Sequence, residues 1–140
     1  MKQLSTESTF IFTNSLLNTK FNKNIDNNLS AHGISYTEYT LMHYLDNAPN
    51  KTMRRIDLAQ QVGLSASGVT RLIAPMVKNN IIEKEINPRD ARVSLVKLSK
   101  TGERLYKDSS ITFEYCIKSM TDKISTIQLE KLIELSKKMM

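Results

Sequence analysis

The chain has 140 residues, of which 40% are hydrophobic and 24% are charged, and this composition is typical of one globular domain that buries a core. Its apolar runs are too short to cross a bilayer and its first residues show no secretory signal, so we expect a cytoplasmic protein that does not span a membrane. The single cysteine, Cys116, excludes a disulfide within the chain.

Positive charge is concentrated in the middle of the chain. The formal net charge is +6, and residues 51–104 carry 11 basic and five acidic side chains, whereas the rest of the chain is neutral. All six arginines lie in this segment. Because arginine binds phosphate and base edges through a rigid planar fork, the distribution favours an anionic partner. A solvated surface that is merely basic is the alternative.

The first part of the chain predicts two helices. Apolar side chains recur at helical spacing over residues 4–29, which indicates one long amphipathic helix. Ser35 and Glu38 have the spacing of a capping box, so a second helix is expected over residues 36–47, stopping near Pro49.

Two shorter helices follow, with a glycine between them. Thr52 is expected to cap the third helix and Gly63 to end it, and Ser65 is a suitable cap for the fourth. The fourth helix has an apolar stripe at intervals of three and four residues, formed by Val69, Leu72, Ile73, Met76 and Val77. This succession is typical of a helix-turn-helix.

A hairpin and two further helices complete the pattern. Residues 81–86 and 93–98 read as strands joined by a type I turn that starts at Asn87. A hairpin directly after a helix-turn-helix indicates a wing. Ser99 then caps a fifth helix with Cys116 on its apolar side, and a sixth, amphipathic helix begins near residue 126.

The winged motif suggests which residues meet DNA, because its second helix enters the major groove and its hairpin tip reaches a neighbouring groove. The candidates on the fourth helix are Ser65, Ser67, Gly68, Thr70 and Arg71. Gly68 either lets the helix backbone approach DNA or packs tightly against the preceding helix. At the hairpin tip we expect Arg92 to enter a narrow minor groove, held by Asp90, and Arg89 to reach phosphate. A surface ion pair without a binding role is the alternative for Arg92.

The stretch "IDLAQQVGLSASGVTRLIAPMVKNNII" followed by "NPRDARVSLVKLSKTG" resembles the MarR-type transcriptional regulators. The resemblance covers residues 55–105 and implies a mainly α (α+β) fold, in which a winged helix-turn-helix is joined to terminal helices that form a dimerisation domain. It assigns residues 36–103 to the DNA-binding domain, and residues 1–35 and 104–140 to the dimerisation region.

The same resemblance implies a homodimer that binds a pseudopalindromic operator in double-stranded DNA. Such regulators are usually repressors, released by a small molecule or by oxidation. The positions carried over from the family are Ser67, Thr70, Arg71, Asp90 and Arg92.

Two features of this chain bear on how it would be regulated. Oxidation-sensing relatives carry a reactive cysteine in the first helix, whereas Cys116 is expected in the core of the fifth helix. Tyr36, Tyr39 and His43 share one face of the second helix. They could meet a small aromatic or carboxylate ligand between the two parts of the protein, or they could form an aromatic core stripe.

Two other classes of function remain to be weighed. The two histidines, His32 and His43, do not have metal-ligand spacing, and the sequence contains neither a phosphate-binding loop nor a nucleophile elbow, so we expect no enzyme, no metal and no cofactor. A winged-helix module that binds protein or RNA is the remaining alternative to a DNA-binding regulator. The arginines of the fourth helix and the hairpin favour duplex DNA.

Overall fold

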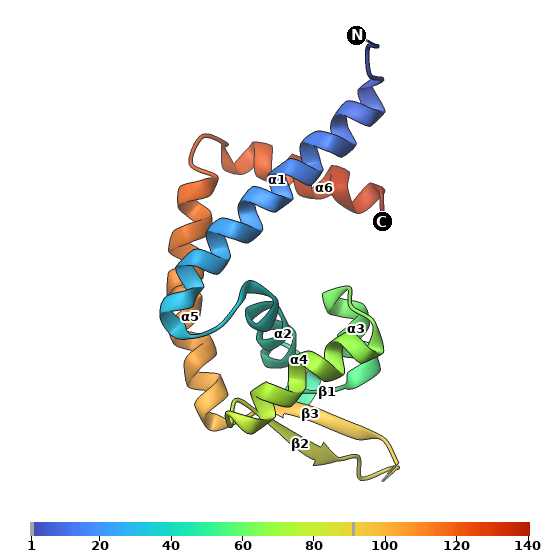
Figure 1. Cartoon of the computed structure of the whole chain (residues 1–140), viewed down its shortest axis with the longest axis vertical. Coiled ribbons are helices and arrows are strands. Elements are labelled where there is room, and N and C mark those ends of the chain that lie inside the picture. The colour runs from blue at the N-terminus through green and yellow to red at the C-terminus, as the bar shows by residue number, and fades with distance from the viewer. Residues whose placement is uncertain (1, 91) are drawn as a thin grey trace.

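The computed structural model describes residues 2–90 and 92–140. The described part of residues 36–98 forms a winged unit, and the helices at residues 6–29, 100–120 and 126–138 form a long helical arm that carries it (Figure 1). The α-helices are α1 (Thr6–Leu29), α2 (Tyr36–Asp46), α3 (Arg55–Val62), α4 (Ala66–Lys78), α5 (Lys100–Met120) and α6 (Thr126–Lys138). The expected mainly α (α+β) winged helix-turn-helix fold is confirmed. No helix of the described residues is long and apolar enough to span a membrane.

A small antiparallel sheet lies below the helices. Its strands are β1 (Thr52–Arg54), β2 (Ile82–Ile86) and β3 (Ser94–Leu98), in the order β1-β3-β2. Ile82 pairs with Leu98 and Ile86 with Ser94, so β2 and β3 are the two arms of the expected wing. This register fixes the face of each wing residue, which the imperfect alternation of the sequence left undecided.

The expectation that Thr52 caps the third helix is wrong. Thr52 pairs with Lys97 in β1, and α3 begins only at Arg55, after an N-cap residue, Arg54, that makes no side-chain cap bond. The β-branched Thr52 suits a strand, and the ladder with β3 gives its backbone polar groups partners. A local capping pattern does not reveal such pairing, because β3 lies far along the chain.

The other expected helix boundaries are confirmed. The Ser35 backbone N–H donates to Glu38 Oε1 (2.9 Å) and the Glu38 N–H donates to Ser35 Oγ (3.1 Å), which completes the capping box of α2. Ser65 Oγ accepts a hydrogen bond from the Gly68 N–H (3.0 Å) at the start of α4. Gly63 ends α3 with a left-handed φ of 70°, which glycine adopts without steric cost.

The winged unit is built on a continuous apolar core. Side chains with no solvent exposure come from α2, α3, α4 and β3 and include Leu41, Met42, Leu45, Leu58, Val69, Ile73, Met76 and Val96. The buried stripe of α4 is the one expected from the sequence, with Val69, Ile73 and Met76 at its centre. Because this stripe faces the core, the opposite side of α4 must face solvent.

The start of α5 is locked against the end of the helix-turn-helix. The Ser99 N–H donates to the Ile81 carbonyl (2.9 Å), and its buried hydroxyl donates to the Asn80 carbonyl (2.6 Å) and accepts from the Gly102 N–H (2.9 Å). A Cβ atom at Gly102 would lie far inside contact distance of the Ile81 carbonyl oxygen. This crossing therefore requires glycine.

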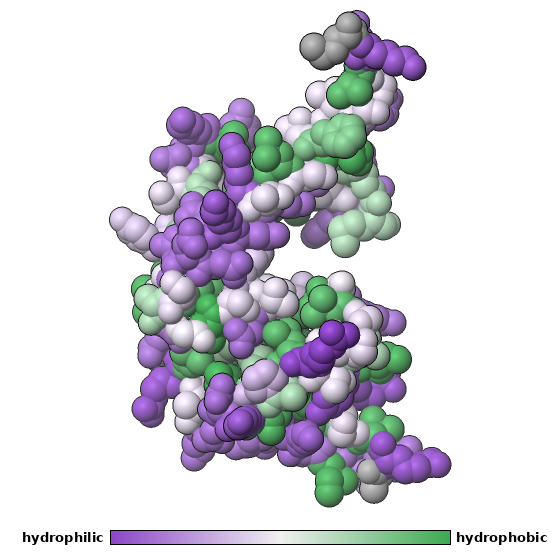
Figure 2. Space-filling model, in the orientation of Figure 1, coloured by the Kyte–Doolittle hydropathy of each residue, from purple (hydrophilic) through white to green (hydrophobic). Residues whose placement is uncertain are grey.

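The arm exposes apolar side chains that its own chain does not cover. Figure 2 shows hydrophobic side chains gathered over the outer half of α1. Among the described residues, α6 packs extensively on no other element. The exposed apolar side chains of these two segments are Phe10, Ile11, Phe12, Leu16, Leu17, Ile127, Leu132, Ile133, Leu135 and Met139.

We predict that Gly102→Ala destabilises the protein by about 2–3 kcal/mol, because the added methyl group forces the Ile81 backbone away from α5. Gly68 is a matched control, since it occupies the same third position of a serine-capped helix and its Cβ would meet only side chains, at 3.2 Å from Ser65 Oγ and 3.6 Å from Leu64 Cβ. Gly68→Ala should stay within about 1 kcal/mol of wild type. Urea unfolding followed by circular dichroism measures both, and equal losses would contradict the assignment.

Candidate nucleic-acid interface

One face of α4 presents polar groups to solvent. Ser67, Thr70 and Arg71 are exposed, as is the cap residue Ser65. They lie opposite the buried stripe, so their hydroxyl and guanidinium groups are available to a partner. Hydroxyls donate to phosphate or base edges, and an arginine can form two parallel hydrogen bonds with guanine. The structure thus brings the expected residues of the fourth helix onto one accessible surface.

Gly68 lies half-buried on the same helix. The neighbours that a Cβ atom would meet within 4 Å belong to the cap residue Ser65 and to Leu64 in the preceding turn. Neither residue is part of α3, which ends at Val62. Packing against the preceding helix therefore does not explain this glycine, and close approach of a DNA backbone stays a prediction.

The wing tip is an ordered turn. The Asp90 N–H donates to the Asn87 carbonyl (3.2 Å), as expected of the type I turn, and the Arg89 N–H donates to Asn87 Oδ1 (2.9 Å). Asn87 thus accepts hydrogen bonds from the third and fourth residues of the turn. Arg89 is left exposed at the tip.

Asp90 holds the side chain of Arg92, as the sequence analysis expected. Asp90 Oδ1 accepts from the Arg92 backbone N–H (3.0 Å) and from Nε (3.1 Å), and Oδ2 accepts from Nη2 (3.4 Å). These bonds hold the pKa of the Asp90 carboxyl below its ordinary value. The Arg92 side chain is nevertheless 91% exposed. It is therefore a restrained but highly exposed guanidinium at the wing tip.

A second arginine–aspartate pair of the same form was not anticipated. Asp57 Oδ2 accepts from Arg54 Nε (2.8 Å) and Oδ1 accepts from Nη2 (3.1 Å). The side-chain hydrogen bonds from Arg54 lower the pKa of the Asp57 carboxyl. The spacing of three residues was visible in the sequence, but the expected cap at Thr52 placed the helix start too early.

The two acidic residues of β2 share one lysine on β3. Lys97 Nζ lies 3.9 Å from Glu83 Oε2 and 3.7 Å from Glu85 Oε1. Because both carboxylates are paired with this lysine, they weaken the positive potential of the wing tip less than two isolated charges would.

The aromatic residues of α2 line a small cavity. Tyr36, Tyr39 and His43 meet there, as expected, and the cavity measures about 180 Å³. Tyr39 is also a core residue, since its ring centroid lies 4.6 Å from that of Phe113 and its hydroxyl donates to Ser110 Oγ (3.0 Å). Tyr39 thus belongs to the core while it lines the cavity, and a ligand for Tyr36, Tyr39 and His43 stays a prediction.

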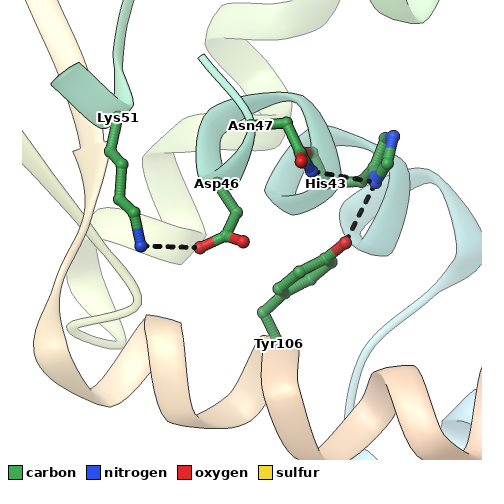
Figure 3. Close-up of polar contacts among 5 residues, drawn as sticks. All are labelled: His43, Asp46, Asn47, Lys51 and Tyr106. Atoms are coloured by element: carbon green, nitrogen blue, oxygen red, sulfur yellow. Dashed lines mark hydrogen bonds and ion pairs between the residues drawn. The ribbon is translucent and has the colours of Figure 1, made fainter. Parts of the chain in front are cut away.

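Polar contacts connect the C-terminal end of α2 to α5 and to the loop that follows α2 (Figure 3). The Tyr106 hydroxyl lies 2.9 Å from His43 Nδ1, and Asn47 Nδ2 lies 3.3 Å from the same nitrogen. Asp46 Oδ1 pairs with Lys51 Nζ at 3.4 Å. A molecule in the cavity would therefore contact the winged unit and the arm at once.

The described residues give little support to a reactive thiol or a metal site. Cys116 is buried in α5, as expected, and burial raises the pKa of its thiol, which disfavours the reactive thiolate. Within residues 2–90 and 92–140, no three histidine, cysteine, aspartate or glutamate side chains gather to hold a metal ion.

Because Tyr39 is buried, the free energy of unfolding should fall at alkaline pH. Burial raises the pKa of Tyr39 from 10.0 to about 12, so the folded state favours the neutral phenol. This contribution to the free energy of unfolding is fully present below about pH 10 and is lost as pH rises toward about 12. The total loss is about 2–3 kcal/mol. We predict that Tyr39→Phe loses less stability than wild type over this range in urea unfolding. Tyr115→Phe, at an 81% exposed position, should follow wild type, and identical profiles of all three proteins would contradict the assignment.

Comparisons with known proteins agree with this geometry. A family model described as the MarR family matches residues 34–94. Transcriptional repressor MprA of Escherichia coli (strain K12) is 21% identical over 124 residues, or 89% of this chain and 70% of that protein. AbsC, a MarR family transcriptional regulator from Streptomyces coelicolor, has the same fold with a TM-score of 0.88 at 18% identity, over 99% of this chain and 95% of that one.

A variant of MarR from Escherichia coli, solved in complex with operator DNA, has a TM-score of 0.83 at 19% identity, over 98% of this chain and 99% of that one. The family match includes the helix-turn-helix and the wing tip, and the structural likeness extends to the arm. On these grounds residues 34–94 resemble the MarR family, and the chain has the fold of solved MarR-family structures.

Proposed function

We propose that the protein is a sequence-specific transcriptional regulator that binds operator DNA as a homodimer. The observation that carries this proposal is that the exposed polar face of α4 and the restrained, exposed Arg92 at the wing tip belong to one winged unit with a common apolar core. In winged helix-turn-helix proteins these two elements enter adjacent grooves. The MarR variant in complex with operator DNA supports the proposal.

The residues have separate roles in this proposal. Ser67, Thr70 and Arg71 read base edges or hold phosphate in the major groove, while Ser65 and Gly68 start the helix there. Arg92 enters the neighbouring minor groove, and Arg89 contacts the backbone. The duplex is expected to be pseudopalindromic, because a two-fold dimer presents two identical surfaces.

The dimer is formed by the arm. Residues 1–35 and 104–140 form the dimerisation region and residues 36–103 the DNA-binding domain, although α5 runs unbroken through the boundary between them. The uncovered apolar side chains of α1 and α6 would be buried between two copies, which contributes roughly 25 cal/mol for each Å² removed from water. One winged unit alone offers a small contact with DNA, and pairing doubles it.

Repression released by a ligand is the proposed mode of action in the cytoplasm. MprA is named a transcriptional repressor. A small aromatic or carboxylate molecule would fit the cavity at Tyr36, Tyr39 and His43. Binding there would displace or reinforce the contact between His43 and Tyr106, and so change the angle between the winged unit and the arm.

A winged-helix module for a protein or RNA partner is less well supported. Such a module has no need of a restrained arginine at the wing tip, whereas Arg92 is held there by Asp90 and Arg71 is exposed on α4. Binding of the wild-type protein to DNA separates the two possibilities.

Selection from a random duplex library followed by fluorescence anisotropy tests the function. The selected duplex should bind on the order of 10³-fold more tightly than a scrambled one, and both affinities should fall steeply between about 50 and 200 mM salt. Failure to bind either duplex would contradict a DNA-binding function and favour a protein partner.

We predict that Arg92→Ala weakens operator binding by roughly tenfold and removes a preference for A/T base pairs beside the half-sites, because the side chain no longer enters a narrow minor groove. Anisotropy with A/T-flanked and G/C-flanked versions of the selected duplex measures both effects. A variant that keeps the wild-type affinity and preference would show that the wing tip does not read the groove.

We predict that Leu132→Asp converts a dimer into a monomer, because a carboxylate would be buried in the apolar contact between two arms. Light scattering after size-exclusion chromatography measures the mass, which should fall from about twice 16.0 kDa to about that value. Circular dichroism checks that the helices are kept. A wild-type monomer, or a variant dimer of unchanged stability, would exclude this surface.

A further inference from the structure

We propose that Arg54, held by Asp57, is a second contact to the DNA backbone beside the wing. This inference rests on the proposed function and adds a residue that neither the family's wing nor its recognition helix contains. It assigns the end of β1 and the start of α3 to the DNA-binding surface.

Two arginine–aspartate pairs of the protein have the same geometry. In both Arg54–Asp57 and Arg92–Asp90, the carboxylate accepts from Nε and Nη2 of the guanidinium. This side-on geometry leaves Nη1 and the second hydrogen of Nη2 for another acceptor. The Arg54 side chain is 52% exposed, so a phosphate can reach those hydrogens. The aspartate restricts the arginine before binding and reduces the entropy lost on contact.

Arg54 occupies the N-cap position of α3 but makes no cap hydrogen bond, whereas serine, threonine, asparagine or aspartate there would stabilise the helix. A cation is also unfavourable near the positive end of a helix. An exposed ion pair adds little to stability. Local stability therefore does not explain an arginine at this position.

The register of the sheet places Arg54 at the end of β1 that is nearest the wing turn, where it pairs with Leu95 of β3. Arg92 lies three residues before Leu95, and three residues of chain span at most ~10 Å. A minor groove is ~6 Å wide between its phosphate rows. With Arg92 in the groove, Arg54 is at a suitable distance to reach one of those rows.

The order of the helices also favours a backbone contact at this position. In helix-turn-helix proteins the first helix of the motif crosses the DNA backbone while the second lies in the major groove. Here α3 is the first helix, and it starts directly after Arg54.

The test is the salt dependence of DNA binding by the full-length Arg54→Ala variant. A lost phosphate contact should lower the slope of log affinity against log salt by roughly 0.9 for each contact. It should also weaken the selected duplex and the scrambled duplex alike, by about tenfold, because a backbone contact does not depend on sequence. Arg54→Lys should keep the slope but not the full affinity, since lysine cannot form the two-bonded pair.

Lys123→Ala is the control for the loss of one positive charge. Lys123 is exposed in the turn between α5 and α6, outside the apolar faces of α1 and α6 that are assigned to the dimer, and its removal changes the net charge equally. It should leave affinity and slope at the wild-type values, and thermal unfolding should be alike in both alanine variants.

An Arg54→Ala variant with wild-type affinity and slope overturns this inference while leaving the proposed function standing. A loss confined to the selected duplex also overturns it, because the residue would then read bases. Wild-type affinity of Arg54→Lys overturns the role of Asp57. A wild-type protein that binds neither duplex overturns both proposals.

Discussion

The close crossing of α5 over the Ile81 carbonyl connects the two halves of the protein. Ser99 bonds to the end of the helix-turn-helix and caps α5, and Gly102 lets the two backbones approach. Because α5 continues from this crossing into the arm, its first turn sets the direction in which the arm leaves the winged unit. The contacts of Tyr39 and His43 with α5 support the same geometry from α2. In the proposed dimer, a change in the spacing of the two winged units would act through these contacts.

The surface proposed for DNA depends on rigidity as much as on charge. A single amphipathic helix, α4, supplies the core with one face and the candidate contacts with the other. Two arginines are held by aspartates of the same chain, so each offers a positioned guanidinium at the cost of one neutralised charge. Such pairs help to fix the position of the protein on DNA more than they add to affinity. A restrained side chain loses less entropy on binding and tolerates fewer wrong positions. The remaining attraction comes from the basic residues spread over the winged unit.

Local signals in the sequence predicted most of the fold, and contacts between distant segments account for what was missed. The caps at Ser35, Ser65 and Ser99 and the stripe of α4 depend on residues a few positions apart, so they were readable. Strand β1 depends on pairing with β3 and was mistaken for a helix cap. The cavity needs Phe113 of α5 beside α2, and the need for glycine at position 102 depends on Ile81. These follow only once the tertiary arrangement is known.

A crystal structure of the protein bound to its selected duplex is the most direct test of the proposed mode of binding. We expect two protomers related by a two-fold axis, with α4 of each in a major groove and Arg92 in the adjoining minor groove. The apolar faces of α1 and α6 should be buried between the protomers. A complex in which DNA contacts another face, or in which a single protomer binds with the arm exposed, would contradict it.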